Sequence, residues 1–113
     1  MHEMSIAEGI IQLLEEQAAC QGFVRVRTVW LEIGPLAMIE PEALRFCFEA
    51  VSRNSLADQA RLEIIERPGL AWCLGCSQQV PVRQRYDQCP ECGSHQLQVI
   101  QGEEMRVKEL EVE

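Results

Sequence analysis

The chain has 113 residues, of which 18 are acidic and 10 are basic, and its formal net charge is −8 at pH 7. This length allows one domain, or one small domain with a satellite module, and a hydrophobic fraction of 47% is ordinary for a globular protein. Net negative charge repels phosphate, which argues against a binder of nucleic acid or of anionic membranes. No apolar run approaches the ~20 residues that span a bilayer, and no secretory signal is visible, so we expect a cytoplasmic protein.

The first predicted element is a helix over residues 5–21. Ser5 and Glu8 match the S-x-x-E capping box, in which each side chain binds a free backbone N–H at a helix start. Gly22 supplies a stop. The apolar residues that recur between them at helical spacing are Ile6, Ile10, Leu13 and Leu14.

The alternation of apolar side chains predicts a strand over residues 24–34, which ends at Gly34-Pro35. Its apolar alternation changes phase between Val26 and Val29, which indicates either a bulge or a strand covered on both faces. A second helix is predicted from Pro41, with Glu40 at or near its cap. One apolar stripe follows at i, i+3, i+4 and i+7, made of Leu44, Cys47, Phe48 and Val51.

Two cysteines stand outside any paired motif. Cys47 lies within the apolar stripe, and Cys20 lies near the end of the first helix. We expect both to be small buried hydrophobes, and a redox partnership between them is the alternative.

Two further strands are predicted after the second helix. Residues 61–67 form one, and Pro68-Gly69 breaks it. The terminal stretch, residues 103–113, alternates charged and apolar side chains and needs a partner strand. We expect it to return to the sheet of the first domain, which makes that domain discontinuous.

The other four cysteines form two C-x2-C pairs separated by 12 residues: Cys73 and Cys76, then Cys89 and Cys92. Two such knuckles bring four thiolates to one point, which suits tetrahedral Zn²⁺, and rubredoxin-type iron is the main alternative. A closed four-sulfur site leaves no position for substrate, so we expect it to be structural. His95 either replaces a cysteine under some conditions or is an ordinary turn residue.

The N-terminal residues Met1, His2 and Glu3 are a second candidate site. The α-amine of Met1, the imidazole and backbone nitrogen of His2, and the backbone nitrogen of Glu3 can close fused chelate rings around one metal ion. Planar nitrogen sets favour Ni(II) or Cu(II). An ordinary exposed terminus is the alternative.

Several segments, in this order, resemble the HypA/HybF family of hydrogenase maturation factors over essentially the whole chain. They are MHEMS at the start, VWLEIG at residues 29–34, RFCFEAV, AWCLGCSQ, QCPECG and the ending GEEMRVKELEVE. The match favours the HybF-like branch. The resemblance implies an α+β fold: a small two-helix, three-stranded α/β nickel-binding domain with an inserted all-β zinc-ribbon domain. We place the first domain at residues 1–68 and 102–113, and the ribbon at residues 69–101.

The resemblance also implies a nickel metallochaperone that helps to insert Ni(II) into the large subunit of [NiFe]-hydrogenase, together with a partner maturation GTPase. Carried over by residue, it implies nickel at His2, with Met1 and Glu3 supplying terminal or backbone nitrogens. It gives Glu40 either an accessory role or helix capping. Its structural zinc ligands are Cys73, Cys76, Cys89 and Cys92. We expect a monomer or weak homodimer.

Enzyme activity is not expected, because the sequence has no G-x-x-x-x-G-K-[ST] loop and no evident nucleophile or general base. The rival hypothesis is a zinc-ribbon protein–protein adaptor with no nickel role. An aromatic content of 5% offers few stacking platforms for nucleic acid in either case.

Overall fold

The computed structural model describes residues 2–113, so Met1 lies outside the described part of the chain. The chain divides into two compact units. Unit 1 comprises residues 1–31, 39–64 and 107–113, and unit 2 comprises residues 32–38 and 65–106. Among residues 2–113, no helix is both long enough and apolar enough to span a bilayer.

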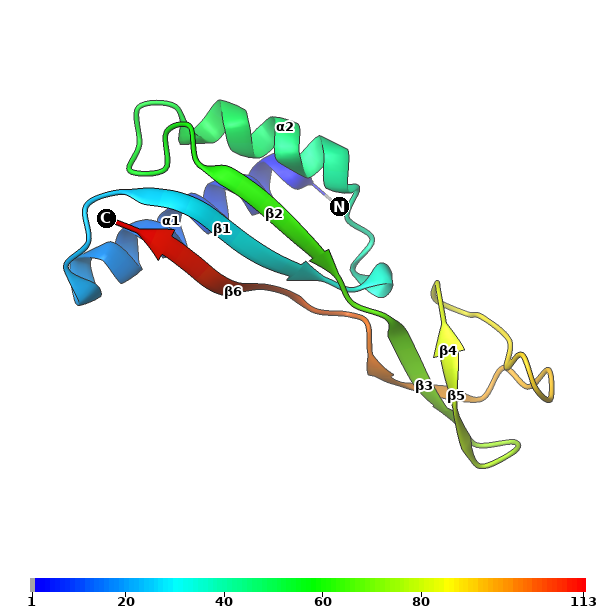
Figure 1. The fold of residues 1–113 in the computed structure, drawn as a ribbon. Coiled ribbons are helices and arrows are strands. Elements are labelled where there is room, and N and C mark those ends of the chain that lie inside the picture. The colour runs from blue at the N-terminus through cyan, green and yellow to red at the C-terminus, as the bar shows by residue number, and fades with distance from the viewer. Residues whose placement is uncertain (1) are drawn as a thin grey trace. The chain divides into compact units, whose positions relative to one another are not determined.

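Unit 1 is built on two helices that pack against each other and on a three-stranded sheet in the order β2-β1-β6 (Figure 1). The elements are α1 (Glu3–Gln21), β1 (Val26–Ile33), α2 (Pro41–Ser52), β2 (Arg61–Glu66) and β6 (Met105–Val112). The last two residues of β1, the last two of β2 and the first two of β6 belong to unit 2. β6 neighbours β1, which confirms that the C-terminal segment returns to the first sheet.

The central strand β1 is buried in both phases of its alternation. Val29, Leu31 and Ile33 are buried in one phase, and Thr28 and Glu32 in the other. A strand covered on both faces was one of the two predicted outcomes. The strand begins at residue 26, two residues later than predicted: Val24 is 79% exposed, and the backbone of residues 24–25 bonds only to Glu113, which follows β6.

The start of α1 differs from the prediction. The helix begins at Glu3 with His2 as its N-cap, and no side chain caps it, so the Ser5–Glu8 capping box is wrong. The first-turn amides of a helix have no intrahelical partner and can be left to water, while the acidic Glu3 suits the positive end of the helix. The predicted stop is confirmed, because Gly22 adopts a left-handed conformation and its N–H donates to the Ala18 carbonyl.

The start of α2 confirms its predicted cap. Pro41 is the first helical residue, and the Glu40 carboxylate accepts from the Glu42 N–H at 3.3 Å.

Burial of the unpaired cysteines is only partly as expected. Cys47 is half-buried in the stripe, whereas Cys20 is exposed, so its predicted burial is wrong. Neither cysteine is in a disulfide.

Unit 2 contains a second three-stranded sheet, in the order β4-β3-β5. Its elements are β3 (Gly69–Cys73), β4 (Gln78–Val82), β5 (Leu97–Gln101) and a short 3-10 helix, Pro35–Ala37. A small core joins the helix to the sheet through Leu36, Ala71, Val82 and Leu97.

Two glycines allow a tight crossing of the backbone inside unit 2. The Leu36 N–H donates to the Gly102 carbonyl at 2.8 Å, and the Gly34 N–H donates to the Glu104 carbonyl at 2.9 Å. A Cβ on Gly34 would overlap the Gly102 carbonyl, and Gly102 has a φ of +124°. Both positions therefore require glycine.

A charged cluster flanks this crossing, within unit 2. The buried Glu32 carboxylate pairs with Arg106 at 3.0 Å and with Arg67 at 3.3 Å. Glu104 accepts from the Gly102 N–H at 3.0 Å through one oxygen, and its other oxygen is buried. The single negative charge of buried Glu32 thus faces two arginines, whereas the buried second oxygen of Glu104 accepts no hydrogen bond from the described residues.

Candidate metal sites

The two C-x2-C segments form the same kind of turn. In the first, which links β3 to β4, the Ser77 N–H donates to the Cys73 carbonyl at 2.9 Å. In the second, the Gly93 N–H donates to the Cys89 carbonyl at 2.8 Å. The closing residue has a positive φ in both turns, +52° at Ser77 and +76° at Gly93. Each turn therefore directs its two cysteine side chains to the same side of the backbone.

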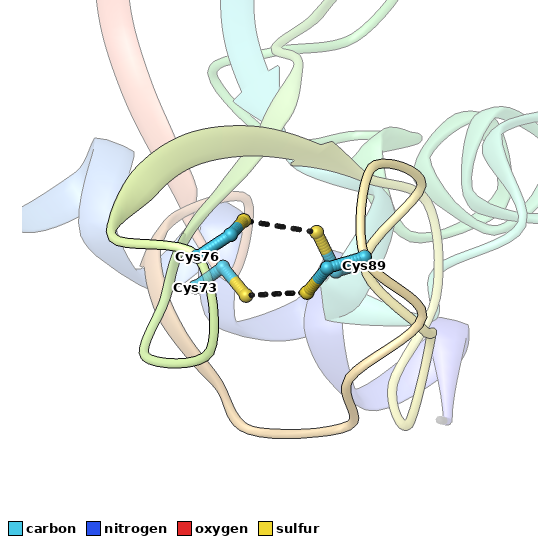
Figure 2. Close-up of side chains that lie close together, drawn as sticks. Cys73, Cys76 and Cys89 are labelled. Atoms are coloured by element: carbon cyan, nitrogen blue, oxygen red, sulfur yellow. Dashed lines mark hydrogen bonds between the residues drawn. The ribbon is translucent and has the colours of Figure 1, made fainter.

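The four sulfur atoms of the two turns converge. The Sγ atoms of Cys73 and Cys92 are 3.6 Å apart, and those of Cys76 and Cys89 are 3.7 Å apart (Figure 2). All four lie within 4.8 Å of one another. Cys73 and Cys89 are buried, while Cys92 is exposed. The cluster thus has a sheltered inner side and an outer side that metal can reach.

The sulfur spacing suits a tetrahedral metal ion. Four sulfurs at ~2.3 Å from a central Zn²⁺ lie about 3.8 Å from one another, close to the two separations observed. Two donors also point at the sulfurs: the Glu91 N–H at 3.4 Å from Cys89 Sγ, and the Gln78 side-chain amide at 3.3 Å from Cys76 Sγ. Such donors stabilise thiolates. The cluster is suited to structural zinc, as its spacing in the sequence predicted.

The protein environment separates the acidities of the free thiols. Burial raises the pKa of Cys89, but the N–H groups of Cys92 and Glu91 outweigh it and lower that pKa to about 7. The Gln78 amide lowers the pKa of Cys76, but burial and the neighbouring thiols raise it to about 12. The free thiols of the cluster therefore lose their protons in separate steps, and binding of a metal ion displaces those that remain.

His95 lies outside the sulfur cluster. Its side chain is exposed, and its Nε2 atom is 3.2 Å from the Gln88 side-chain amide. Of the two roles considered for His95, the described geometry is that of a turn residue beside the second knuckle.

The predicted N-terminal site can be described from His2 onward, since Met1 falls outside the described residues. His2 is exposed and extended, and its carbonyl accepts from the Ile6 N–H at 3.2 Å. The His2 imidazole makes no capping hydrogen bond. No second group of three converging His, Cys or acidic side chains occurs within residues 2–113, so a metal at His2 needs main-chain nitrogens.

One contact near His2 was not foreseen. The Glu3 carboxylate accepts from the Glu40 N–H at 3.3 Å, which ties the first residue of α1 to the cap of α2. Sequence patterns gave no signal for it, because the two residues are 37 positions apart. The Glu3 carboxylate is thus engaged by the backbone of Glu40, and the Glu40 side chain caps α2.

Comparison with known proteins identifies the family. The family model described as "Hydrogenase/urease nickel incorporation, metallochaperone, hypA" matches residues 1–112. The chain belongs to the HypA family. Hydrogenase maturation factor HypA of Azotobacter vinelandii is 74% identical over 113 residues, and that of Rhodopseudomonas palustris is 59% identical over 113 residues, with both chains covered in full in each case.

Solved structures of HypA proteins have the same fold. The solution structure of the nickel metallochaperone HypA from Helicobacter pylori is 29% identical with a TM-score of 0.72, covering 99% of this chain and 97% of that one. A second HypA solution structure is 30% identical with a TM-score of 0.69, covering 99% and 96%. The predicted α+β fold and family are thereby confirmed. The HypA family is one of nickel metallochaperones for hydrogenase maturation rather than one of enzymes.

Proposed function

We propose that this chain carries Ni(II) on its N-terminus, with the His2 imidazole and backbone nitrogen, the Met1 α-amine and the Glu3 backbone nitrogen as ligands. The exposure of His2 at the very start of α1 carries the proposal. The main-chain N–H groups there have no helical partner, so a metal can bind them without breaking a helix bond. Few ligands at an exposed terminus suit a cargo that must be released.

The four cysteines would then hold a resident Zn²⁺ that stabilises unit 2. Their geometry supports this role, because a closed S₄ site leaves no coordination position for substrate. Rubredoxin-type iron would use the same ligands. Elemental analysis and X-ray absorption of the purified protein separate the two: one zinc per chain with four sulfur neighbours is expected, and nitrogen or oxygen ligands contradict the assignment.

In the cell, the chain would act in the cytoplasm, as a monomer or weak homodimer. It would dock onto a partner maturation GTPase and onto the large subunit of [NiFe]-hydrogenase, and transfer nickel by ligand exchange. The names of the relatives support the hydrogenase client. The partner would supply nucleotide hydrolysis, because the sequence of this chain has no phosphate-binding loop.

The decisive experiment replaces one of only two histidines. In zinc-loaded protein, His2→Ala removes the imidazole and should abolish stoichiometric Ni(II) uptake, measured by calorimetry, without changing zinc content. His95→Ala is the matched control and should bind Ni(II) like the parent. If His2→Ala still binds one Ni(II) with unchanged affinity, the nickel site lies elsewhere.

A second variant tests the α-amine. One glycine added ahead of Met1 keeps every side chain but turns that amine into a peptide nitrogen and moves His2 to the third position. Since three-residue termini that end in His also chelate nickel, we expect a changed Ni(II) absorption spectrum and impaired delivery, with binding retained. An unchanged spectrum would exclude the α-amine as a ligand.

A further inference from the structure

The edge strands of the two sheets, β2, β6, β4 and β5, differ in how well their side chains block pairing with a further strand. β4 carries the exposed Pro81, and the edges β2 and β6 carry charged side chains along their length. β5 has the sequence LQVIQ, with no charge and no proline. Val99 and Ile100 on this strand are 41% and 56% exposed. Proteins normally block an edge strand with charge or proline, so an unblocked apolar edge marks a place where another strand can pair.

A small cavity of about 200 Å³ lies between one face of this sheet and the loop after β4. Its apolar lining comes from Val82 of β4 and from Leu97 and Val99 of β5. The rest of its lining is Gln84, Arg85, Tyr86, Asp87 and His95. Its volume is smaller than the ~300–1,000 Å³ of typical small-molecule pockets and fits a single side chain. The pairing of β5 with β3 is regular over residues 97–99 and shifts at Ile100. Leu97 and Val99, within the regular stretch of this edge strand, therefore also line the cavity.

The loop that walls this cavity presents an aromatic residue. Tyr86 is 94% exposed and has a φ of +66°. Its neighbour Asp87 accepts from the N–H groups of Arg83 and Gln84, at 2.9 and 3.2 Å, which holds the loop in shape. With the loop backbone held in this way, Tyr86 has mainly side-chain freedom to lose on binding, and tyrosine is enriched at protein interfaces.

The same loop is basic. Residues 83–87 hold two arginines, Arg83 and Arg85, and one aspartate, Asp87, so the loop has a formal charge of +1 in a chain whose net charge is −8. Arg85 has only a loose partner, Glu103 at 3.4 Å, and both side chains are about half exposed. This local charge favours an acidic partner. It also disfavours a second copy of this chain on the edge, because β5 offers no carboxylate to the arginines and two copies repel each other.

We propose that the edge of β5 and its adjacent cavity receive an extended segment of another protein, which adds a strand to the β4-β3-β5 sheet. One apolar side chain of the segment enters the cavity, and flanking acidic residues contact Arg83 and Arg85. Main-chain hydrogen bonds would supply affinity, and the cavity and charges would supply specificity, as in other cases of strand addition.

The test uses ¹⁵N-labelled, zinc-loaded, nickel-free full-length protein, so its result does not depend on the nickel proposal. The probe is the capped peptide Thr-Glu-Thr-Ile-Thr-Glu-Thr, whose two glutamates and isoleucine share one face of a strand. We expect saturable shifts of the backbone amides of residues 97–101 and 84–86, and slower hydrogen exchange in residues 97–101.

Matched probes separate the contributions. One variant peptide has lysines in place of the glutamates, and another has alanine in place of isoleucine. Each should bind the parent protein about tenfold more weakly than the original peptide does. Arg85→Glu protein should bind the original peptide about tenfold more weakly than the parent protein does. Arg53→Glu makes the same charge change in unit 1 and should bind within about twofold of the parent. Absence of saturable shifts, or equal binding by all three peptides, overturns the proposal. Concentration-dependent dimerisation through residues 97–101 would also overturn it, and would assign the edge to a second copy.

Discussion

The two candidate metal sites are opposite in construction. The cysteine cluster uses four side chains from two matching turns, with two of its cysteines buried and its sulfurs already at the spacing a tetrahedral ion needs. At His2, one exposed side chain adjoins main-chain nitrogens at the start of a helix. The first arrangement can hold an ion as part of the fold. The second can bind and release an ion without disturbing any packed residue.

Under the proposed assignment, one short chain separates a resident metal from a transported one by the source of its ligands. Side chains fixed by packing give a site whose loss costs folding energy. Backbone groups at a helix end are already exposed, so loading and unloading them costs little structure. If the two sites are separate in this way, unit 1 should stay folded when unit 2 loses its metal.

The largest expected effect comes from Cys73→Ala. The free energy of structural zinc binding is about 10–16 kcal/mol in small zinc modules, and removing one of four ligands forfeits much of it. We expect loss of zinc and collapse of amide signal dispersion for residues 69–101, with the signals of α1 retained. Elemental analysis and NMR check both parts. Simultaneous loss of the α1 signals would show that the units do not fold independently.

Gly34→Ala should also destabilise unit 2, without touching either metal site. The added Cβ would overlap the Gly102 carbonyl, and we expect a cost of about 3 kcal/mol, the upper range for overpacking. Chemical denaturation of zinc-loaded protein measures it. Gly9→Ala is the control: it lies in α1 with open space around it, and should stabilise by about 0.5–1 kcal/mol. Equal effects at the two glycines would contradict the crossing.

Glu104→Gln should have a smaller effect that depends on pH. The Gly102 N–H holds the pKa of Glu104 below its ordinary value, assisted by Arg67 and Arg106 and opposed by burial. A depressed folded-state pKa means that ionised Glu104 stabilises the fold above the unfolded-state pKa, and that this contribution fades as pH falls through the folded-state value. We expect the variant to be less stable by up to about 1 kcal/mol at pH 7.

Chemical denaturation at several values from pH 7 down to pH 3 measures the difference in unfolding free energy between the parent and Glu104→Gln. The difference should shrink as the pH falls. A difference that is constant across this range would mean that charge on Glu104 contributes nothing.

The smallest effect is expected from Glu40→Ala. Losing the side-chain cap of α2 should cost about 0.5–1 kcal/mol in unit 1. If capping is its whole role, Ni(II) affinity stays at the parental value. A drop of about tenfold in Ni(II) affinity would instead make Glu40 a nickel ligand and give the N-terminal site a second side chain.

Features that depend on neighbours in the sequence were predictable. The spacing of Cys73, Cys76, Cys89 and Cys92 indicated their cluster, Pro41 and Glu40 marked the start of α2, and Gly22 marked the end of α1. In each case the signal is local chemistry: a turn, a cap or a periodic stripe. The ends of α1, the ends of β1 and the start of α2 could therefore be placed within about two residues.

Features that depend on distant neighbours were not predictable. β3 and β5 are short and lack a clean alternation of apolar residues, so only their mutual pairing identifies them. The Glu3–Glu40 contact and the Gly34–Gly102 crossing join segments tens of residues apart. The capping box failed for a different reason: the S-x-x-E pattern is present, but the helix simply starts two residues earlier.

The pairing of Leu70 with Gln101 has a consequence for the history of this chain. β3 and β5, the first and last strands of the ribbon, are antiparallel partners. The two ends of residues 70–101 therefore lie side by side. A gene could gain or lose this stretch as one cassette, bridged by a short turn, without altering the span that the flanking residues must cover. Insertion of a module is tolerated best where its two ends lie close together, because its host then needs little rearrangement.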